Sequence, residues 1–314
     1  MDVCAALKQR LETVLPGVEI REQEPMSRHT SFRIGGPASL MVLPHTEEEA
    51  VTAVQEAHRM GYPVVLMGKG TDLLVADRGV EALVVKAADH WNEIRQTGTY
   101  EMVAQCGALL SRAANFAAEQ SWSGLEFAQG IPGTIGGAVT MNAGAYDGEM
   151  SQVVVSVRHL EQDGTVVELL PDQLDFGYRH SCYSDGKRLI LSAKLALHPG
   201  EQRAILEKMD DFRQRRRSKQ PLEYPSAGSM FKRPPGHFAG GLIDACGLRG
   251  FTVGGAQVSE KHAGFVINKG GATCEDVMTL VREVQRIVRE ETGVELQMEV
   301  RTLGLETAES EDRG

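Results

Sequence analysis

The chain has 314 residues, a length that predicts two or three domains rather than one small core. Hydrophobic residues make up 42% and charged residues 24%, which excludes a disordered chain, a collagen-like repeat and a disulfide scaffold. The formal net charge of −10 argues against general binding to nucleic acid, so an anionic ligand would need a local basic pocket.

The five cysteines are widely spaced with no C-x-x-C pair, and the nine histidines show no metal-ligand spacing. The sequence therefore predicts neither a disulfide framework nor a metal site. Charged residues run through the first thirty positions, and no apolar run approaches the ~18 residues that span a bilayer. We expect a reducing, cytoplasmic protein that partners neither membrane nor nucleic acid.

Strands and helices alternate in the first third of the chain. A strand is expected over Ala38–Leu43, and Thr46 with Glu49 forms a capping box that opens a helix ended by Gly61. Further elements are expected as a strand over Pro63–Met67, a strand over Ala82–Lys86 and a helix over Ala108–Glu119.

The middle is rich in strands and the C-terminal part holds two long helices. Asp163-Gly164 is a hairpin signature between strands over Val153–Leu160 and Val166–Leu170. The remaining predicted elements are a strand over Leu189–Leu197, a helix from Glu201, a helix from Thr273 to Gly293, a strand over Glu295–Leu303 and a disordered acidic tail over 305–314.

Two glycine-rich segments are the first candidates for ligand contact. Gly68-Lys-Gly-Thr-Asp-Leu73 follows an apolar strand and could cradle a phosphate in backbone N–H groups, although a plain tight turn explains it equally well. Gly130–Gly148 has six glycines in nineteen residues around Thr134, Asn142 and Tyr146. That composition suits a diphosphate and a flat ring lying on bare backbone, with tight packing as the alternative.

Four further features each have an ordinary structural explanation when taken alone. Tyr178-Arg-His-Ser181 could be surface, Ser229 a turn residue, Glu299 part of a solvated strand face, and the basic run Arg213–Lys219 a complement to a helix end. The alternative for the basic run is a local clamp for a ligand diphosphate. No G-x-S-x-G motif points to acyl chemistry.

Eight motifs occur in one order along the chain: Thr30-Ser-Phe-Arg-Ile-Gly-Gly36, Ser123-Gly-Leu-Glu126, Gly130-Ile-Pro-Gly-Thr-Ile-Gly-Gly137, Asn142-Ala-Gly-Ala-Tyr146, Tyr178-Arg-His-Ser181, Ser226-Ala-Gly-Ser-Met-Phe-Lys232, Gly255-Ala-Gln-Val-Ser-Glu-Lys-His262 and Glu299-Val-Arg301. Over about residues 28–304 the chain closely resembles the UDP-N-acetylenolpyruvoylglucosamine reductase family, flavoenzymes of bacterial peptidoglycan synthesis, in the branch that lacks a tyrosine-bearing insertion.

The resemblance implies an α+β fold: a two-subdomain FAD-binding region of the vanillyl-alcohol-oxidase type plus a C-terminal α+β substrate domain. The domains implied are an N-terminal segment over 1–27, the FAD-binding region over 28–200 with subdomains of about 28–86 and 87–200, and the substrate domain over 201–304. The implied cofactors are FAD and NADPH, the partner is the small-molecule substrate alone, and a monomer is expected.

The resemblance also implies a two-stage reaction. NADPH reduces FAD and leaves; the enolpyruvyl ether then takes a hydride from flavin N5, and the resulting enolate is protonated. Arg179 and Glu299 are implied as stabilisers of the enolate and carboxylate, and Ser229 as the proton donor.

Binding residues follow from the same resemblance. Those implied for the cofactor are Arg33, Gly68, Lys69, Gly70, Thr71, Asp72, Leu73, Gly124, Glu126, Ile131, Pro132, Gly133, Thr134, Gly136, Gly137, Asn142, Gly144, Ala145 and Tyr146. Those implied for the substrate are Tyr178, Arg217, Lys219, Lys232, Gln257, Lys261, His262 and Asn268.

Three departures from the family pattern stand out. Thr71-Asp72 replaces a common Ser-Asn, so Asp72 is not expected to meet a diphosphate through its carboxylate; Arg233 replaces a common asparagine; and the chain between Tyr178 and Ser229 has no room for the tyrosine-bearing insertion.

Two other functions compete with the reductase. A flavin oxidase of the same fold would pass electrons to oxygen and would not need Ser229. A flavin- or UDP-sugar-binding regulator would be favoured by loss of Arg179, Ser229 or Glu299, and all three are present.

Overall fold

The computed structural model describes residues 2–88, 90–162 and 164–305. These residues form two compact units, each assembled from separate stretches of chain. Within the described residues the first unit comprises 2–22, 40–69 and 82–218, and the second 23–39, 70–81 and 219–305. Helices and strands are mixed in both, which confirms the α+β class; the domain boundaries expected from the sequence stay a prediction.

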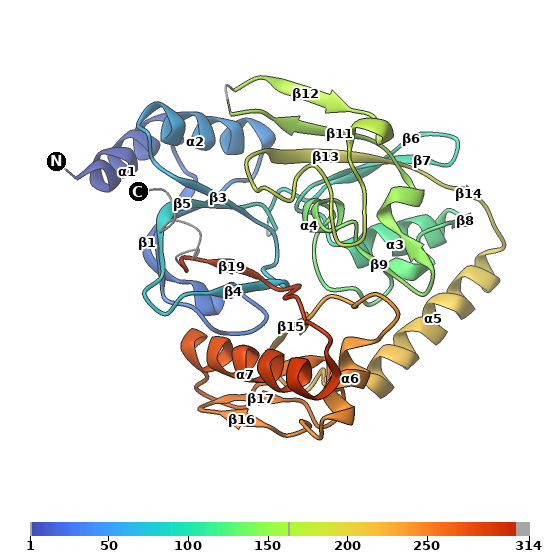
Figure 1. Cartoon of the computed structure of the whole chain (residues 1–314). Helices are drawn as coiled ribbons and strands as arrows, with labels where there is room; N and C mark the ends of the chain where they lie inside the picture. The colour runs from blue at the N-terminus through green and yellow to red at the C-terminus, as the bar shows by residue number, and fades with distance from the viewer. Residues whose placement is uncertain (1, 89, 163, 306–314) are drawn as a thin grey trace. The chain divides into compact units, whose positions relative to one another are not determined.

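A five-stranded antiparallel sheet in the order β12-β11-β13-β7-β6 dominates the first unit (Figure 1). Its strands are β6 (Ile94–Gly98), β7 (Glu101–Gln105), β11 (Val154–Leu160), β12 (Val166–Leu169) and β13 (Leu189–Ala196). The predicted hairpin is confirmed: β11 pairs with β12, and the Glu161 N–H donates to the Thr165 carbonyl. Asp163 of the hairpin signature lies outside the described residues.

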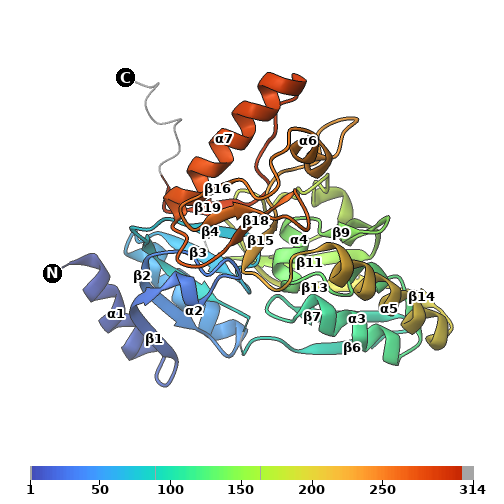
Figure 2. The same cartoon turned by 90° about the horizontal axis from the view of Figure 1, so that it is seen from below.

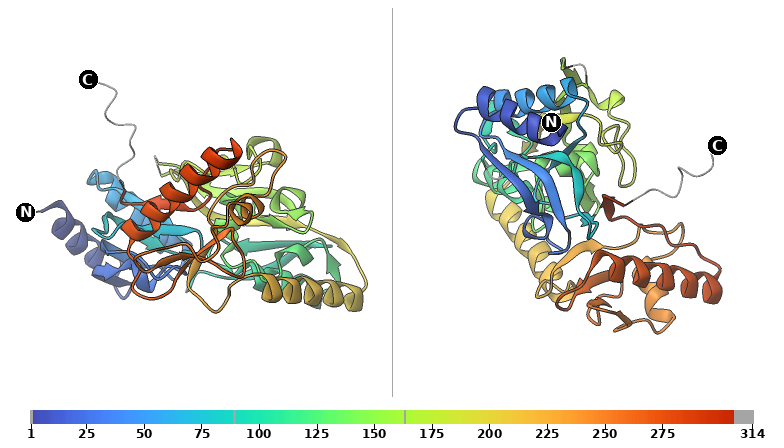
Figure 3. Two further views of the ribbon diagram at one scale, coloured as in Figure 1. Left: turned by 60° about the horizontal axis from the view of Figure 1, so that its bottom comes forward. Right: turned by 90° about the vertical axis from the view of Figure 1, so that its left-hand side faces the viewer.

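A second sheet has the order β1-β2-β5-β3, with β3 parallel to β5. Its strands are β1 (Glu19–Pro25), β2 (Pro37–Leu43), β3 (Val64–Met67) and β5 (Val80–Lys86). The helices of the first unit are α1 (Val3–Val14), α2 (Glu47–Arg59), α3 (Leu110–Glu119), α4 (Ile135–Thr140) and α5 (Gln202–Lys219). The predicted capping box of α2 is confirmed, whereas α1, which packs beside α2 (Figure 3), was not predicted.

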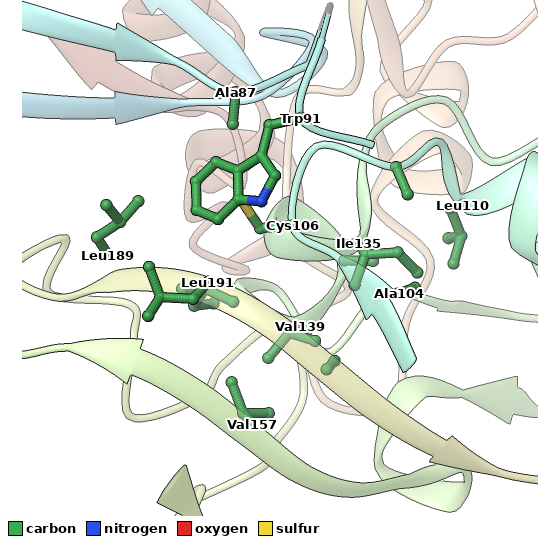
Figure 4. Close-up of a cluster of buried hydrophobic side chains, with 14 of the residues drawn as sticks. Ala87, Trp91, Ala104, Cys106, Leu110, Ile135, Val139, Val157, Leu189 and Leu191 are labelled. Carbon is green, nitrogen blue, oxygen red and sulfur yellow. The ribbon is translucent and has the colours of Figure 1, made fainter. Parts of the chain in front are cut away.

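The core of the first unit fixes the short helix α4. Figure 4 shows the fully buried Trp91 above Cys106 and Leu191, with Ile135 and Val139 of α4 in the same cluster. Because Ile135, Ala138 and Val139 are buried while Gly137 between them is exposed, α4 turns one glycine outward and its apolar side inward.

The second unit is built on an antiparallel sheet in the order β15-β18-β17-β16, against which α7 packs through β16 and β17 (Figure 2). Its elements are β15 (Ser226–Ser229), α6 (Ala239–Ala245), β16 (Thr252–Val253), β17 (Ala256–Val258), β18 (Phe265–Asn268) and α7 (Cys274–Thr292). β4 (Leu73–Val75) pairs in parallel with β19 (Arg301–Leu303).

The predicted strand over Glu295–Leu303 was too long. Only Arg301–Leu303 forms a strand. The residues before it make a single isolated bridge, between Met298 and Phe231, in place of a continuous ladder. Short pairs complete the described chain: β8 (Trp122–Ser123) with β14 (His198–Pro199), and β9 (Gly144–Ala145) with β10 (Gly148–Glu149). No described helix is both long and apolar enough to cross a bilayer. Except for Leu305, the predicted acidic tail lies outside the described residues.

The start of α7 is capped twice. Its first turn forms a capping box at the predicted helix start, in which the Thr273 hydroxyl accepts from the Asp276 N–H and the Asp276 carboxylate accepts from the Thr273 N–H. A distant residue adds to it: Asp77, from the turn after β4, accepts from the N–H groups of Cys274 at 2.8 Å and Glu275 at 3.1 Å. The cap therefore ties residues 70–81 to α7 inside the second unit.

We predict that Asp77→Ala lowers the stability of the second unit by about 1–2 kcal/mol, because it leaves two helix N–H groups without acceptors and removes a favourable charge from the helix start. Hydrogen exchange at the amides of 274–277 should become faster. Glu81→Ala, an exposed carboxylate in the same stretch, is the matched control and should change little. Equal protection in both variants would contradict the assigned role of Asp77.

Candidate functional site

Gly68, which begins the first glycine-rich segment, meets the second segment inside the first unit. Gly68 follows β3, and a Cβ built on it would collide with the side chain of Thr134, the N-cap residue of α4. Only glycine allows this approach without a shift of Thr134. The structure thus brings together two segments that the sequence marked separately as candidates for cofactor contact.

The second segment is anchored by its backbone on the connection between β7 and α3. The N–H groups of Ile135 and Gly136 donate to the carbonyls of Ala108 and Cys106, each at 2.8 Å. A Cβ on Gly136 would lie 3.1 Å from Cys106 Cβ, whereas on Gly137 the nearest atom would be Thr134 Oγ1 at 3.8 Å. Gly136 therefore faces the interior, and Gly137 presents bare backbone to an open side.

Arg179 sits in a tight turn of unusual geometry. Gly177 and His180 exchange backbone hydrogen bonds, and Arg179 has a φ of 54°, in the left-handed region normally taken by glycine or asparagine at this position of a turn. Its guanidinium donates to the Gly144 carbonyl at 3.1 Å. Such strained residues persist only where their surroundings hold them.

Two buried side chains supply that hold. Asn142, 1% exposed, donates to the Gly177 carbonyl at 3.0 Å and accepts from the Ser151 N–H at 2.9 Å. Ser181, fully buried, donates to the Thr140 carbonyl at 2.8 Å. The turn of Arg179 is thus fastened to the end of α4 on one side and to the loop after α4 on the other, and the Asn142 amide is engaged within the protein.

Helix α5 closes against the same loop through an aromatic stack. The rings of Tyr146 and Phe212 lie 4.3 Å apart at an interplanar angle of 10°, and the Tyr146 hydroxyl donates to the Phe212 carbonyl at 3.4 Å. The guanidinium of Arg216 lies 5.4 Å from the Tyr146 ring. Gly130 makes room for this side chain, because a Cβ there would come within 3.0 Å of Arg216 Cδ.

Arg216 was missed by the sequence interpretation. It is only 9% exposed, and among the described residues its Nε and Nη2 find no hydrogen-bond partner. Burial lowers its pKa; the nearby Tyr146 acts in the opposite direction and the Arg179 cation lowers it further. The available signal was its spacing, since Arg216 continues the buried stripe of Ile205, Met209 and Phe212.

Glu126 holds the loop at Gly124. Its carboxylate accepts from the Ser123 hydroxyl at 2.5 Å and from the Gly124 N–H at 3.0 Å, with Lys208 at 3.9 Å. Burial acts to raise its pKa, but these hydrogen bonds outweigh burial and leave the pKa below the usual range. An ionised, fully engaged Glu126 fixes the backbone around Gly124.

Ser229 and Glu299 come together inside the second unit. Ser229 ends β15 opposite Phe265 of β18, and the next residue, Met230, accepts the Glu299 N–H at 2.9 Å through its carbonyl. Lys232 joins the same pairing, because its N–H donates to the Gln297 carbonyl at 2.8 Å. The two candidate catalytic residues are thus carried on adjoining backbone strips, although they are 70 positions apart in sequence.

His262 contacts Phe265, the residue opposite Ser229. Its ring meets Phe265 edge-on at 4.9 Å, and its Nδ1 accepts from the Gly264 N–H at 3.1 Å. Burial lowers the pKa of His262, and the cations Arg249 and Lys219 lower it further, so the ring is neutral near pH 7. A neutral imidazole with its Nδ1 occupied can offer Nε2–H as a donor to a ligand.

Other candidates for substrate contact differ in how their side chains are used. Gln257 donates to Thr252 Oγ1 at 3.0 Å, and Lys261 pairs with Glu223 at 3.6 Å. Asn268, 7% exposed, donates to the Phe32 carbonyl and accepts from the N–H groups of Gly270 and Ala272. Its amide therefore shapes the turn after β18.

The remaining candidates divide between the units. Among these candidates, the ones exposed in the first unit are Lys69, Pro132, Tyr146, Tyr178 and Arg217, and the half-buried ones there are Ile131, Gly133 and Ala145. In the second unit Arg33 and Lys219 are exposed, and Gly70, Thr71, Asp72 and Leu73 lead into β4, where the Asp72 carbonyl accepts from the Arg301 N–H. Among the residues the structure describes, no three His, Cys, Asp or Glu side chains gather as a metal site.

Family comparisons account for both units. Residues 38–170 match the model of the FAD binding domain, and residues 220–303 match that of the C-terminal domain of UDP-N-acetylenolpyruvoylglucosamine reductase. The first unit fits the flavin cofactor: Gly137 offers open backbone, Gly68 permits close approach, and two buried nitrogens of Arg216 have no acceptor among the described residues.

Full-length relatives agree. The chain is 44% identical over 298 residues to a UDP-N-acetylenolpyruvoylglucosamine reductase of Caldanaerobacter subterraneus subsp. tengcongensis, covering 95% of this chain and 98% of that protein. It is 47% identical over 286 residues to one from Clostridium perfringens, covering 91% and 93%.

Solved structures include a member of the same family and more distant proteins that share the fold. The crystal structure of the reductase from Thermus caldophilus has a TM-score of 0.76 and 35% identity, covering 91% of this chain and 98% of that one. 4-Ethylphenol oxidase from Gulosibacter chungangensis, 13% identical with a TM-score of 0.50, covers 63% of this chain and 43% of its own, and shares the fold alone. The FAD-binding region thus has the vanillyl-alcohol-oxidase fold, and the chain belongs to the UDP-N-acetylenolpyruvoylglucosamine reductase family of FAD-dependent oxidoreductases.

Proposed function

We propose that this protein reduces UDP-N-acetylenolpyruvoylglucosamine to UDP-N-acetylmuramate with electrons from NADPH, in peptidoglycan synthesis, and that it acts as a monomer. The observation that supports this best is that Ser229 and Glu299 lie on adjoining backbone, a hydroxyl and a carboxylate, while the neutral ring of His262 contacts Phe265, the strand partner of Ser229. When bound, FAD supplies the two-electron chemistry that takes hydride from NADPH and passes it to the enolpyruvyl group.

The residues of the second unit supply the proton. Hydride addition to the terminal methylene carbon leaves negative charge on the adjacent carbon and its carboxylate, and that carbon must then receive one proton. Ser229 can donate it because Gly228, with a φ of 82° and open space where a Cβ would stand, leaves one side of the serine free of bulk. Glu299 orients the donor and the enol ether.

Arg179 offers a fixed cation for the charge that develops on the substrate. A cation fastened before the reaction needs no reorganisation when the charge appears. We assign Asn142 and Ser181 the role of holding its strained turn, and Asn268 that of shaping the turn after β18, in place of direct ligand contacts. Lys219, whose charge acts on His262, is assigned to the substrate diphosphate, with Arg217 in support.

The function can be tested by two half-reactions under anaerobic conditions. The purified, flavin-loaded protein is reduced with NADPH, and the enolpyruvyl sugar nucleotide is then added while the flavin absorbance is followed. Rapid reoxidation by the sugar nucleotide is expected. Reoxidation by air at a catalytic rate, with no response to the sugar nucleotide, would instead support an oxidase.

We predict that Ser229→Ala separates the two half-reactions. Reduction by NADPH should stay near normal, since the variant keeps Arg179, Glu299 and the flavin site. Reoxidation by the enolpyruvyl substrate should slow at least about 100-fold, because positioned proton donors contribute about 10²–10⁴-fold. Stopped-flow measurement of both steps on one sample decides the point. Equal slowing of the two would make Ser229 a positioning residue for the flavin.

Lys219→Ala should raise the KM for the sugar nucleotide more than it lowers kcat. The ammonium would contact the diphosphate in the ground state and the transition state alike, and loss of uniform binding appears in KM. Steady-state kinetics at saturating NADPH measure this. A fall in kcat with unchanged KM would overturn the assignment of Lys219 as a clamp.

Neighbouring glycines of α4 give a matched pair. Gly137→Val places a branched side chain on the open side, so FAD content should fall while the fold is kept. Gly136→Val instead presses on Cys106 and should lower stability by about 1–3 kcal/mol, as overpacking does. Flavin absorbance per protein and thermal unfolding distinguish the two. Full flavin content in Gly137→Val would remove this face from the cofactor site.

A further inference from the structure

Arg216 combines features that rarely occur together. It stands on the apolar stripe of α5, one turn after Phe212, at a position where helix packing calls for a hydrophobic residue. It is 9% exposed, and two of its three guanidinium nitrogens are shut off from solvent without any partner among the described residues.

Within the part of the chain that the structure describes, no opposite charge balances Arg216. The carboxylates of α5 are otherwise engaged, Asp210 with Arg213 and Asp211 with Arg215, and no described carboxylate forms an ion pair with Arg216. The charged neighbour that acts on it is another cation, Arg179. An unpaired buried charge is strongly unfavourable, so the buried guanidinium of Arg216 indicates the place of an anion.

The position of Arg216 identifies which ligand brings that anion. Its side chain runs over Gly130 and under the Tyr146 ring, so it lies between the first residue of the 130–137 segment and the end of the 142–146 loop. Both belong to the part of the chain that matches the FAD binding domain. Neither Arg217 nor Lys219, the exposed cations that follow it on the helix, shares this burial.

We propose that Arg216 is a cofactor-binding residue whose buried guanidinium binds an anionic oxygen of FAD. Two parts of FAD can supply it: the diphosphate, which is charged in both redox states, and the ring, which gains negative charge on reduction. The inference concerns the flavin alone, so it does not depend on which substrate the enzyme reduces.

Three variants test it. Arg216→Met keeps the length and packing of the side chain and removes the charge; Arg216→Lys keeps a charge without the planar fork; Arg203→Met removes an exposed arginine of the same helix that pairs with Glu207. FAD release from the holoenzyme is followed by the return of flavin fluorescence on dilution, and the reduction potential is measured on the same samples.

If the diphosphate is the anion, Arg216→Met should weaken the binding of oxidised FAD at least about tenfold, as loss of a charged hydrogen bond does. The reduction potential of the flavin should then change little. If the ring is the anion, the potential should fall by about 30 mV for each tenfold lost in preference for reduced flavin. Arg216→Lys should lie between Arg216→Met and the unchanged protein, and Arg203→Met should match the unchanged protein.

If Arg216 instead served only to stabilise the fold, its replacement would destabilise the flavin-free protein. On our proposal, flavin-free Arg216→Met unfolds at no lower temperature than the flavin-free parent, because a buried unpaired charge has been replaced by an apolar side chain. Clear destabilisation of the flavin-free variant would overturn the proposal. So would unchanged FAD affinity and potential, or a change confined to the KM of the sugar nucleotide, which would assign Arg216 to the substrate.

Discussion

The close backbone contact between residues 135–136 and the connection after β7 is the constraint on which the first unit's site depends. Two short hydrogen bonds, to Ala108 and Cys106, leave no space for a side chain on Gly136 and fix where α4 begins. From that fixed start Thr134 meets Gly68, Gly137 faces outward, and the loop after α4 receives the turn that carries Arg179. Packing that involves no ligand thus arranges the groups that a ligand would meet.

Charge is distributed in the two units according to burial. In the first unit Glu126 is ionised and satisfied by local donors, whereas the buried Arg216 has two guanidinium nitrogens with no hydrogen-bond partner among the described residues. In the second unit burial and nearby cations keep His262 neutral, and its ring contacts Phe265, the strand partner of Ser229. The chain, although its net charge is −10, thus buries a guanidinium in the first unit and keeps an imidazole uncharged in the second.

Much of the secondary structure could be predicted because its causes are local. The capping boxes at Thr46 and Thr273, the apolar stripe of α7 and the hairpin between β11 and β12 each depend on residues a few positions apart. Motif order also sufficed for the family and for FAD, since eight short motifs in one order are specific as a set. The roles of the individual site residues remain predictions.

The sequence by itself determined the α+β class, the main helices and the family, whose signals lie along the chain. Tertiary structure decided how side chains are used, because burial and partnership depend on segments far apart in sequence. It engages Asn142 and Asn268 in turns, caps α7 with Asp77, and limits the last strand to three residues. It also buries Arg216 while leaving Arg217 exposed, a difference that a run of identical arginines cannot display until a helix turns each toward a different neighbour.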